Sequence, residues 1–254
     1  MDFQDALNQA ERIIRRGGDR AVEIAGDSQV RREKRHRDIV TDGDLTVEEM
    51  VISDLRERYP DHGFYSEERP PENTSAEYVW VLDPIDGTKH YARHLPYWAV
   101  SLGLERRGEP VLGAVYLPEC GRMYSAAAGR GATLNGRPIR CSTETSLPDA
   151  FLCVEIPHAE SDPSLRSWAM DRLRKLMERT LRVRIIGAGA LGLCFTAAAG
   201  FDAYVNLGSN FKKVDYAAGR AILAEAGAIF EPRGDAILAA PPDLCKPIRE
   251  LLEE

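Results

Sequence analysis

Cysteine is scarce and scattered in this sequence. The 254 residues include five cysteines, an odd number, with no CxxC pair and no histidine at zinc-ligand spacing: Cys120, Cys141, Cys153, Cys194 and Cys245. This pattern excludes a disulfide framework and a zinc-finger site. It predicts free thiols in a reducing compartment, so we expect a cytoplasmic protein.

Long apolar runs are also missing. The longest apolar stretch, residues 188–199, is too short to span a bilayer. The first 14 residues, MDFQDALNQAERII, carry acidic side chains and lack the apolar core of a signal peptide. We therefore expect neither a membrane partner nor secretion.

Positive charge is in deficit. Lys plus Arg total 33 against 40 Asp plus Glu, which gives a formal net charge of -7 at pH 7. A field of this sign repels polyanions, so a nucleic acid polymer is excluded as a general partner. If the substrate is itself an anion, a bound cation must hold it. The remaining composition, 44% hydrophobic and 29% charged, is typical of a soluble globular protein.

Helical periodicity marks the start of the chain. Apolar residues spaced by three, four and seven predict a first helix over residues 2–25. A second helix is predicted from a capping box at Thr46 and Glu49 to Pro60. Five basic residues in the run 31–37 separate the two helices. We interpret this run as a solvated loop, with an anion-steering loop near a site as the alternative.

The pattern then changes to strands. From residue 64, short β-rich runs separated by turn residues predict a sheet with hairpins, and Asn135-Gly136 is the strongest hairpin signal. After residue 147, strands and helices alternate. We therefore predict an α/β protein with two sub-domains packed into one body: an α+β half over 1–147 and an α/β half over 148–254, with the site in the cleft between them. The helices of the second half are expected around 163–178, 190–199, 216–226 and 242–252.

The segment Tyr78–Thr88, YVWVLDPIDGT, carries the clearest chemistry. An apolar strand ends in Asp83, turns through Pro84 and presents Asp86. The proline favours a tight turn on which both carboxylates converge, and convergent carboxylates need a cation between them. Hard oxygen ligands suit Mg²⁺, which fills its coordination with water and substrate phosphate. The backbone N–H groups of Gly87 and Thr88 would favour an anion. An Asp-Pro turn with an Asp cap is the equally weighted structural alternative.

Two other acidic motifs are ambiguous when taken singly. Glu67 and Glu68 end another predicted strand and are compatible with a solvated edge. Asp215 opens a helix, where it fits a simple N-cap. The small side chains of Ala217, Ala218 and Gly219 would let that helix approach another backbone closely.

Taken together, EE, DPIDGT and VDYAAG in this order resemble the inositol monophosphatase superfamily of metal-dependent, lithium-sensitive phosphomonoesterases. The resemblance extends over nearly the whole chain. It includes IVTDGD at 39–44, HGFYSEE at 62–68, the hairpin region LGAVYLPECGRMYSAAAGRGATLNG and GAGALGLC at 187–194. It implies a layered αβαβα sugar-phosphatase fold and a homodimer.

The resemblance also implies roles for individual residues. Two to three Mg²⁺ ions would be held by Glu67, Asp83, the Ile85 carbonyl, Asp86 and Asp215. Glu67 and Thr88 would orient and deprotonate a metal-bound water, with Asp44 supporting Thr88. The phosphate and the alcohol of the substrate would be bound by Gly87, Thr88, Asp86, Gly187, Ala188, Gly189, Ala190 and Asn206. The implied reaction is in-line attack of the activated water on a small phosphate ester, without a phosphoenzyme.

Three departures from the family pattern bear on the substrate. Asn206 stands where inositol monophosphatases usually carry an acid, Val214 replaces a common Trp, and the last strand region is short after residue 235. Inositol monophosphatase-type activity on a sugar or polyol phosphate is the first expectation. Fructose-1,6-bisphosphatase, 3'(2'),5'-bisphosphate nucleotidase and histidinol-phosphatase activities are the alternatives, and Lys89 resembles the nucleotidases.

Two rival classes remain. Gly187, Gly189 and Gly192 match the dinucleotide-binding GxGxxG pattern. Against an NAD-binding protein, Asp202 lies at the start of the next predicted strand, whereas a ribose ligand belongs at its end. A catalytically silent member that binds a partner is the other rival, and the presence of all the implied acids and of Thr88 argues against it. Of the five histidines, His90 is the one close enough to Thr88 to touch a substrate.

Overall fold

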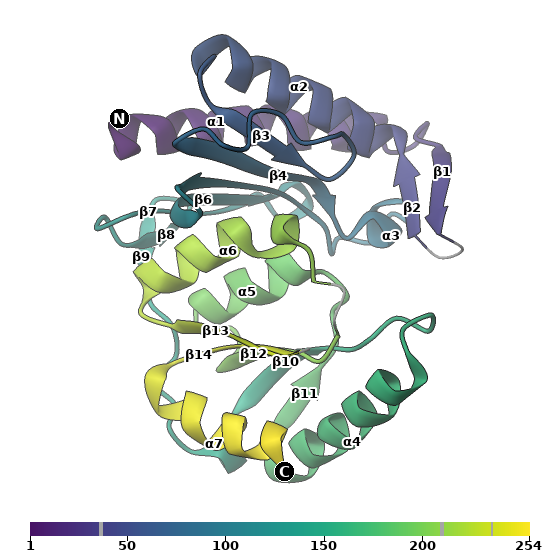
Figure 1. Ribbon diagram of the computed structural model, residues 1–254, viewed down its shortest axis with the longest axis vertical. Helices are drawn as coiled ribbons and strands as arrows, with labels where there is room; N and C mark the ends of the chain where they lie inside the picture. The colour runs from purple at the N-terminus through teal and green to yellow at the C-terminus, as the bar shows by residue number, and fades with distance from the viewer. Residues whose placement is uncertain (36–37, 209–210, 235) are drawn as a thin grey trace.

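The fold has five layers. The computed structural model describes residues 1–35, 38–208, 211–234 and 236–254. From top to bottom, Figure 1 shows a pair of helices, a large sheet, a second pair of helices, a smaller sheet and a third pair of helices. This arrangement confirms the predicted α/β class and the layered αβαβα fold.

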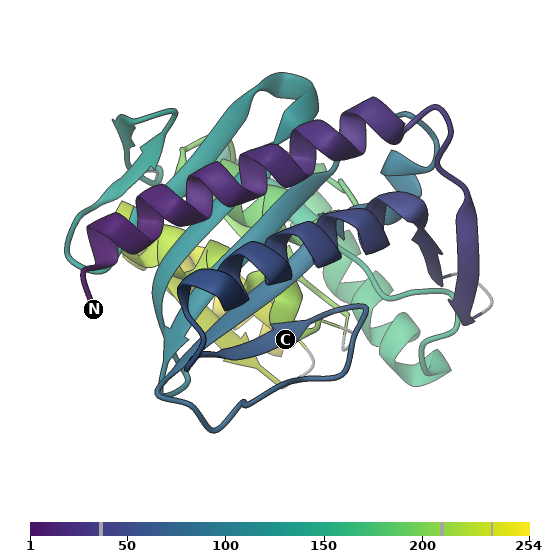
Figure 2. The same cartoon turned by 90° about the horizontal axis from the view of Figure 1, so that it is seen from above.

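The first layer consists of α1 (Phe3–Ile24) and α2 (Asp42–Arg58), which lie side by side across the strands in Figure 2. The apolar face of α1 is buried, as its spacing predicts. The start of α2 was predicted wrongly. The helix begins at Asp42, because Thr41 and Asp44 form the capping box, five residues before Thr46 and Glu49.

The basic run is a strand over most of its length. Residues Val30–Arg35 form β1, which pairs antiparallel with β2 (Asp38–Thr41). The prediction of a loop was wrong because the pairing is supplied by Ile39 and Val40, apolar residues beyond the charged run. His36 and Arg37 lie outside the described residues, and the anion-steering alternative is not tested.

The large sheet has seven strands in the order β3-β4-β5-β6-β7-β8-β9. The β3–β4 pair is parallel and every other pair is antiparallel. Asn135 and Gly136 both have positive φ in the turn between β8 and β9, which confirms the predicted hairpin. The strands are β3 (Gly63–Ser66), β4 (Tyr78–Asp86), β5 (Ala99–Arg106), β6 (Glu109–Leu117), β7 (Arg122–Ala127), β8 (Ala132–Leu134) and β9 (Arg137–Ile139).

The central layer contains α5 (Gly189–Ala197) and α6 (Lys213–Ala226). Helix α6 lies directly on the large sheet at two glycines. A Cβ added to Gly113 would lie 2.2 Å from the Ala218 carbonyl oxygen, and one added to Gly103 would lie 2.9 Å from the Ala218 nitrogen. The predicted close approach of this helix is therefore confirmed. This contact sets the distance between α6 and the large sheet, and so the position of the residues at the start of the helix.

The small sheet has five strands in the order β11-β10-β12-β14-β13. Strand β10 is parallel to β11 and β12, and β14 is antiparallel to both of its neighbours. Strand β14 has the sequence AILAA, an apolar run without polar alternation, and lies where the sequence predicted only a shortened strand region. The strands are β10 (Phe151–Glu155), β11 (Arg182–Arg184), β12 (Ala203–Asn206), β13 (Ile229–Arg233) and β14 (Ala236–Ala240).

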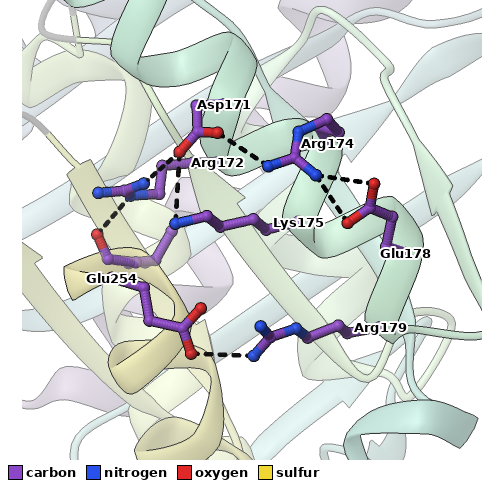
Figure 3. Close-up of polar contacts among 8 residues, drawn as sticks. Asp171, Arg172, Arg174, Lys175, Glu178, Arg179 and Glu254 are labelled. Atoms are coloured by element: carbon purple, nitrogen blue, oxygen red, sulfur yellow. Dashed lines mark hydrogen bonds and ion pairs between the residues drawn. The ribbon is translucent and has the colours of Figure 1, made fainter.

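The last layer is formed by α4 (Pro163–Arg179) and α7 (Pro242–Glu253). Figure 3 shows the polar network that joins them. The Arg172 guanidinium donates to the Leu252 carbonyl at 2.7 Å and pairs with Asp171, and Arg179 pairs with Glu254 at 2.9 Å. The end of the chain is thereby held against α4.

Short elements complete the fold: α3 (Thr88–Tyr91) and the 3-10 helices η1 (Pro118–Cys120) and η2 (Leu147–Asp149). All five cysteines are free, as predicted. In the part of the chain that the structure describes, no helix combines the length and apolarity needed to cross a membrane.

Candidate functional site

The predicted site residues come from both sheets and from four helices. They lie at the carboxyl ends of β3, β4 and β12, in α3, and at the starts of α2, α5 and α6. These element ends gather on the right of Figure 1, where α3 faces the start of α6. Residues more than 100 positions apart in the sequence thus form one group.

The turn at the end of β4 buries two carboxylates. Asp83 pairs with Ser101 of β5 and Asp86 pairs with Ala99, with an irregularity in the register between them. Pro84 stands in this irregularity, where its missing N–H breaks the ladder. Asp83 is 2% exposed and Asp86 is 7% exposed. The prediction that this turn presents both acids close together is consistent with this geometry.

Two buried polar atoms at this point lack partners. Oδ1 of Asp83 and the hydroxyl of Ser101 are both buried with no hydrogen-bond partner among the described residues. Burial raises the pKa of Asp83 well above its usual range, and the charges of Glu67 and Asp86 raise it further. An unsatisfied buried carboxylate is costly, and a bound cation is the usual remedy. The donor set at this point therefore fits a hard divalent cation.

Asp86 caps a helix from the other half of the chain. Its carboxylate accepts N–H bonds from Gly189 at 3.1 Å, Ala190 at 2.9 Å and Leu191 at 3.3 Å. Helix α5 needs this cap because its own N-cap residue, Ala188, has no side-chain acceptor. Burial and the charge of Asp215 nevertheless raise the pKa of Asp86 to about 8.

Thr88 is linked to Asp44 as the resemblance implies. The Thr88 hydroxyl lies 3.1 Å from Asp44 Oδ1 and 2.9 Å from the Ile85 carbonyl oxygen, and both of these atoms are acceptors. Asp44 also accepts from the Thr41 N–H and hydroxyl in the capping box of α2. Burial raises the pKa of Asp44 to about 7, against the opposing effect of these hydrogen bonds. Gly87 precedes Thr88 with φ of 91°.

Glu67 is held from two sides. The loop that carries it is fixed by Glu48, a buried residue of α2 that accepts bonds from the Ser66 hydroxyl and, at 3.1 Å, from the Glu68 N–H. Across the site, the Lys212 ammonium lies 2.8 Å from Glu67 Oε1. Neither Glu48 nor Lys212 was predicted as a site residue. The available signals were Glu48, an acid directly after the apolar Val47 in the predicted helix, and the KK pair before Asp215.

Asp215 is the third residue of α6, where the sequence favoured an N-cap. Its Oδ2 accepts the backbone N–H of Lys212 at 2.7 Å, so the helix begins two residues earlier than the acid. Val214 beside it is buried against Val81 and Ala217. The substitution of the family's Trp by Val is therefore accommodated in a contact between α6 and β4.

Five carboxylates, those of Asp83 and four neighbours, are close enough for their charges to interact. The pKa of Asp83 is raised by the charges of Glu67, Asp86, Asp215 and Asp44 together. Even so, among the described residues no three acidic, histidine or cysteine side chains surround a single point as the ligands of an ion do. Glu67 turns to Lys212, Asp86 to α5 and Asp215 to the backbone of Lys212.

The glycine-rich segment is occupied by carboxylates. Besides Asp86, Glu155 at the end of β10 accepts the Gly187 N–H at 2.9 Å and 3.1 Å with its two oxygens. A dinucleotide pyrophosphate needs these same amides at the helix start. The GxGxxG match is therefore not a dinucleotide site. Glu155 was not predicted, because nothing in FLCVEI distinguishes it from a surface residue.

Asn206 and His90 lie on either side of this segment. Asn206 ends β12 beside Glu155, is 8% exposed, and accepts the Gly208 N–H at 2.7 Å. His90 Nδ1 lies 2.7 Å from the Tyr97 carbonyl, which fixes the proton on that nitrogen. A Cβ added to Gly187 would lie 3.7 Å from His90 Nε2, so the imidazole packs beside the segment 187–190.

Comparisons with known proteins place the chain in a family. The model of the inositol monophosphatase family matches residues 2–242. Inositol monophosphatase 2 of Homo sapiens is 35% identical over 89% of this chain and 78% of its own length. A fructose-1,6-bisphosphatase/inositol-1-monophosphatase of Aquifex aeolicus is 35% identical over 80% of this chain and 75% of its own.

A solved structure shares the fold. Extragenic suppressor protein suhB from Bartonella henselae superposes with a TM-score of 0.92 and 26% identity, over 98% of this chain and 99% of that one. The fold, the family match and these relatives lead to one assignment. The chain belongs to the inositol monophosphatase family, and it is an enzyme of the phosphoric monoester hydrolase class.

Proposed function

We propose that this enzyme is a Mg²⁺-dependent phosphomonoesterase of the inositol monophosphatase type, which hydrolyses a small sugar or polyol phosphate. The observation that carries the proposal is Asp83, a buried carboxylate with an unsatisfied oxygen, whose pKa is raised by the charges of four other acids. A chain with net charge -7 needs bound cations to attract a dianionic ester.

The residues that would hold two to three Mg²⁺ ions are Glu67, Asp83, Asp86, Asp215 and the Ile85 carbonyl. Bound Mg²⁺ supplies a water of lowered pKa and neutralises the phosphate and the leaving oxygen. Asp83 is central in this set, because the charges of all the other acids act on it. Its replacement should therefore affect every ion in the site.

Thr88, Asp44 and Glu67 would handle the proton of the attacking water. The Thr88 hydroxyl, within reach of Asp44 at 3.1 Å, orients the water toward the phosphorus. Glu67 accepts a proton from that water once its own carboxylate has turned from Lys212. The N–H groups of Gly87 and Thr88 at the start of α3 would donate hydrogen bonds to the phosphate oxygens.

The alcohol of the ester would lie against Gly187, Ala188, Gly189 and Ala190, with Asn206 and His90 at the edges. The Asn206 oxygen is engaged by Gly208, so its amide group offers donors rather than the charge of an acid. Position 206 carries an Asn in place of the acid that inositol monophosphatases usually have. A second candidate substrate is therefore fructose 1,6-bisphosphate, which the Aquifex relative's name includes. Lys89 and Lys212 would favour its second phosphate.

We also propose a homodimer that uses the edge of the small sheet. Strand β11 is an edge strand, and exposed apolar side chains flank it: Met170, Met177, Leu181 and Ile185, each 44% to 64% exposed. Exposed apolar groups beside an unpaired strand edge are typical of an interface. Light scattering should give a dimer, and Leu181→Glu should give a monomer.

Two further parts of the proposal concern organisation. We propose a division into sub-domains at 1–147 and 148–254, supported by the two sheets, which do not share a strand. We propose a cytoplasmic location, supported by the five free cysteines. Separate expression of the two ranges and cell fractionation test these proposals.

The test is phosphate release with Mg²⁺ or EDTA from inositol 1-phosphate, fructose 1,6-bisphosphate, adenosine 3',5'-bisphosphate and histidinol phosphate. We expect release from a polyol or sugar phosphate in Mg²⁺ alone, and none from the Asp83→Asn variant. Release in EDTA at the same rate would contradict the metal-dependent mechanism. Preference for the nucleotide or histidinol ester would keep the class and replace the substrate.

A further inference from the structure

Lys212 connects two acids that come from opposite halves of the chain. Its ammonium lies 2.8 Å from Glu67 Oε1, 145 residues away, and its backbone N–H donates to Asp215 Oδ2 at 2.7 Å. Lys212 is the N-cap residue of α6, so its Cα is fixed by the helix. Its side chain is 48% exposed, whereas Glu67 is 15% exposed. The positive charge therefore enters the site from its solvent side.

The adjacent lysine has a different partner. Lys213 lies 2.5 Å from Glu105, a residue of β5 that is 6% exposed in its side chain. Its ammonium also lies 5.6 Å from the centre of the Tyr65 ring. The two consecutive lysines thus pair with different carboxylates: Lys212 with Glu67 in the site, and Lys213 with Glu105 of β5. The KK pair is not simply a basic surface.

The Lys212–Glu67 pair is easily exchanged. An ion pair with a half-exposed partner contributes little, because water competes for both groups and the long side chain loses rotamer freedom. A divalent cation attracts the same carboxylate with twice the charge and gains from the other acids nearby. The ammonium and a divalent cation at Glu67 would repel each other, so binding of the divalent cation should weaken the pair with Lys212.

We propose that Lys212 is a built-in placeholder cation: it pairs with Glu67 until a divalent cation binds there, and then turns to the anionic substrate. This inference rests on the proposed function, since it takes Glu67 as a metal ligand. The displaced ammonium remains tethered at the start of α6, within one side-chain length of Glu67. A phosphate bound at the metals would lie within its reach, so Lys212 becomes a specificity-determining residue for dianionic esters.

The first test is a titration with Mg²⁺ alone, without substrate, in which binding is measured by calorimetry. Because an exposed ion pair changes an equilibrium constant by at most about fivefold, Lys212→Met should tighten Mg²⁺ binding by about two- to fivefold. Lys212→Arg, whose planar fork holds a carboxylate with two bonds, should weaken it. Lys246→Met, which removes an exposed lysine of α7, is the control for net charge.

The second test follows the displacement itself. We would acetylate the protein with acetic anhydride and measure each lysine by mass spectrometry, with and without saturating Mg²⁺. Acetylation of Lys212 should rise at least twofold with Mg²⁺, whereas Lys213 and Lys246 should not change. In steady-state kinetics, Lys212→Met should raise KM for the ester severalfold and leave kcat within about twofold.

The outcomes separate this inference from the function on which it rests. If the wild-type protein binds no Mg²⁺, both the proposed function and the placeholder role are wrong. If it binds Mg²⁺ and Lys212→Met binds it equally tightly, with no change in Lys212 acetylation, the placeholder role alone is wrong. If Lys246→Met tightened Mg²⁺ binding as much as Lys212→Met, the effect would come from net charge alone. The placeholder role would then also be wrong.

Discussion

The two halves of the molecule hold their site residues by different means. Asp83 and Asp86 in the first half lie on one strand end, three residues apart, and the turn through Pro84 sets their separation. The contributions of the second half, Asp215 and the amides of α5, are placed by packing over long sequence distances. Local connectivity fixes one side of the site, and helix packing on glycines fixes the other.

Because of this difference, substitutions in the two halves should affect different properties. A change at a carboxylate of the first half should alter ion binding while leaving the fold intact. A change under α6 should alter the fold and, through it, the distance between the halves. The following predictions test this separation, beginning with the largest expected effect.

Asp83→Asn and Asp215→Ala should both lower kcat by about three orders of magnitude, because each removes a carboxylate that would hold a metal ion. They should differ in stability. Asp215 accepts the Lys212 N–H, so the Ala variant, which has no acceptor, should lose about 1 kcal/mol of unfolding free energy. Asp83→Asn removes a buried charge and should not destabilise the protein in EDTA.

Phosphate release and urea unfolding in EDTA measure these two effects. Asp54→Asn, on the outer face of α2, is the matched control and should retain full activity. A fully active Asp83→Asn would show that the turn after β4 is a structural Asp-Pro turn, as the alternative from the sequence holds.

The pH dependence of stability should reverse the usual acid behaviour. Folded Asp44 and Asp86 have pKa values of about 7 and about 8, above the value of ~3.9 of an unfolded Asp. Below about pH 4 the two carboxyls are protonated in both the folded and the unfolded protein, and their full contribution to stability is present. As the pH rises to 8, they ionise first in the unfolded chain, so the free energy of unfolding falls. Each unit by which a pKa is raised corresponds to about 1.4 kcal/mol of stability lost in this way.

Thermal melting in EDTA from pH 5 to pH 8 measures this loss. Saturating Mg²⁺ should reduce the slope, because bound cations stabilise the ionised carboxylates. Asp86→Asn should flatten the curve in EDTA. A variant with the wild-type slope would mean that Asp86 is ionised throughout this range.

Gly113→Ala should destabilise the fold by about 1–3 kcal/mol, because the new methyl group would lie 2.2 Å from the Ala218 carbonyl oxygen and α6 must move away. Activity should fall together with stability, since Asp215 moves with the helix. Gly26→Ala, where an added Cβ meets nothing within 4 Å, is the control. Unchanged unfolding by urea would show that the two layers are not in rigid contact.

Glu48→Gln should have the smallest effect of these changes. It removes the ion pair with Arg69 and keeps one oxygen for Ser66 and Glu68, so the loop of Glu67 should loosen without unfolding. Residues that orient metal ligands typically contribute about tenfold or more to metal affinity. We expect about tenfold weaker Mg²⁺ binding by calorimetry, with thermal melting in EDTA within a few degrees of the wild type.

The sequence predicted the parts of the site that depend on local chain geometry. The acids of DPIDGT, the Thr88 contact with Asp44 and the small face of α6 follow from short motifs or from the family resemblance. Glu48, Glu155 and Lys212 act across 20, 32 and 145 residues, and no local pattern reveals such partners. The strand at 30–35 was missed for the same reason, because its pairing partner lies beyond it.

The cap of α5 has a consequence for the order of folding. Ala188 offers no acceptor, so the first amides of this helix are satisfied only when β4 is in place and Asp86 reaches them. A nine-residue helix without a cap is unstable by itself, and α5 should therefore form only after the large sheet has folded. Hydrogen exchange at Gly189, Ala190 and Leu191 would then report the docking of one half on the other, long before substrate is present.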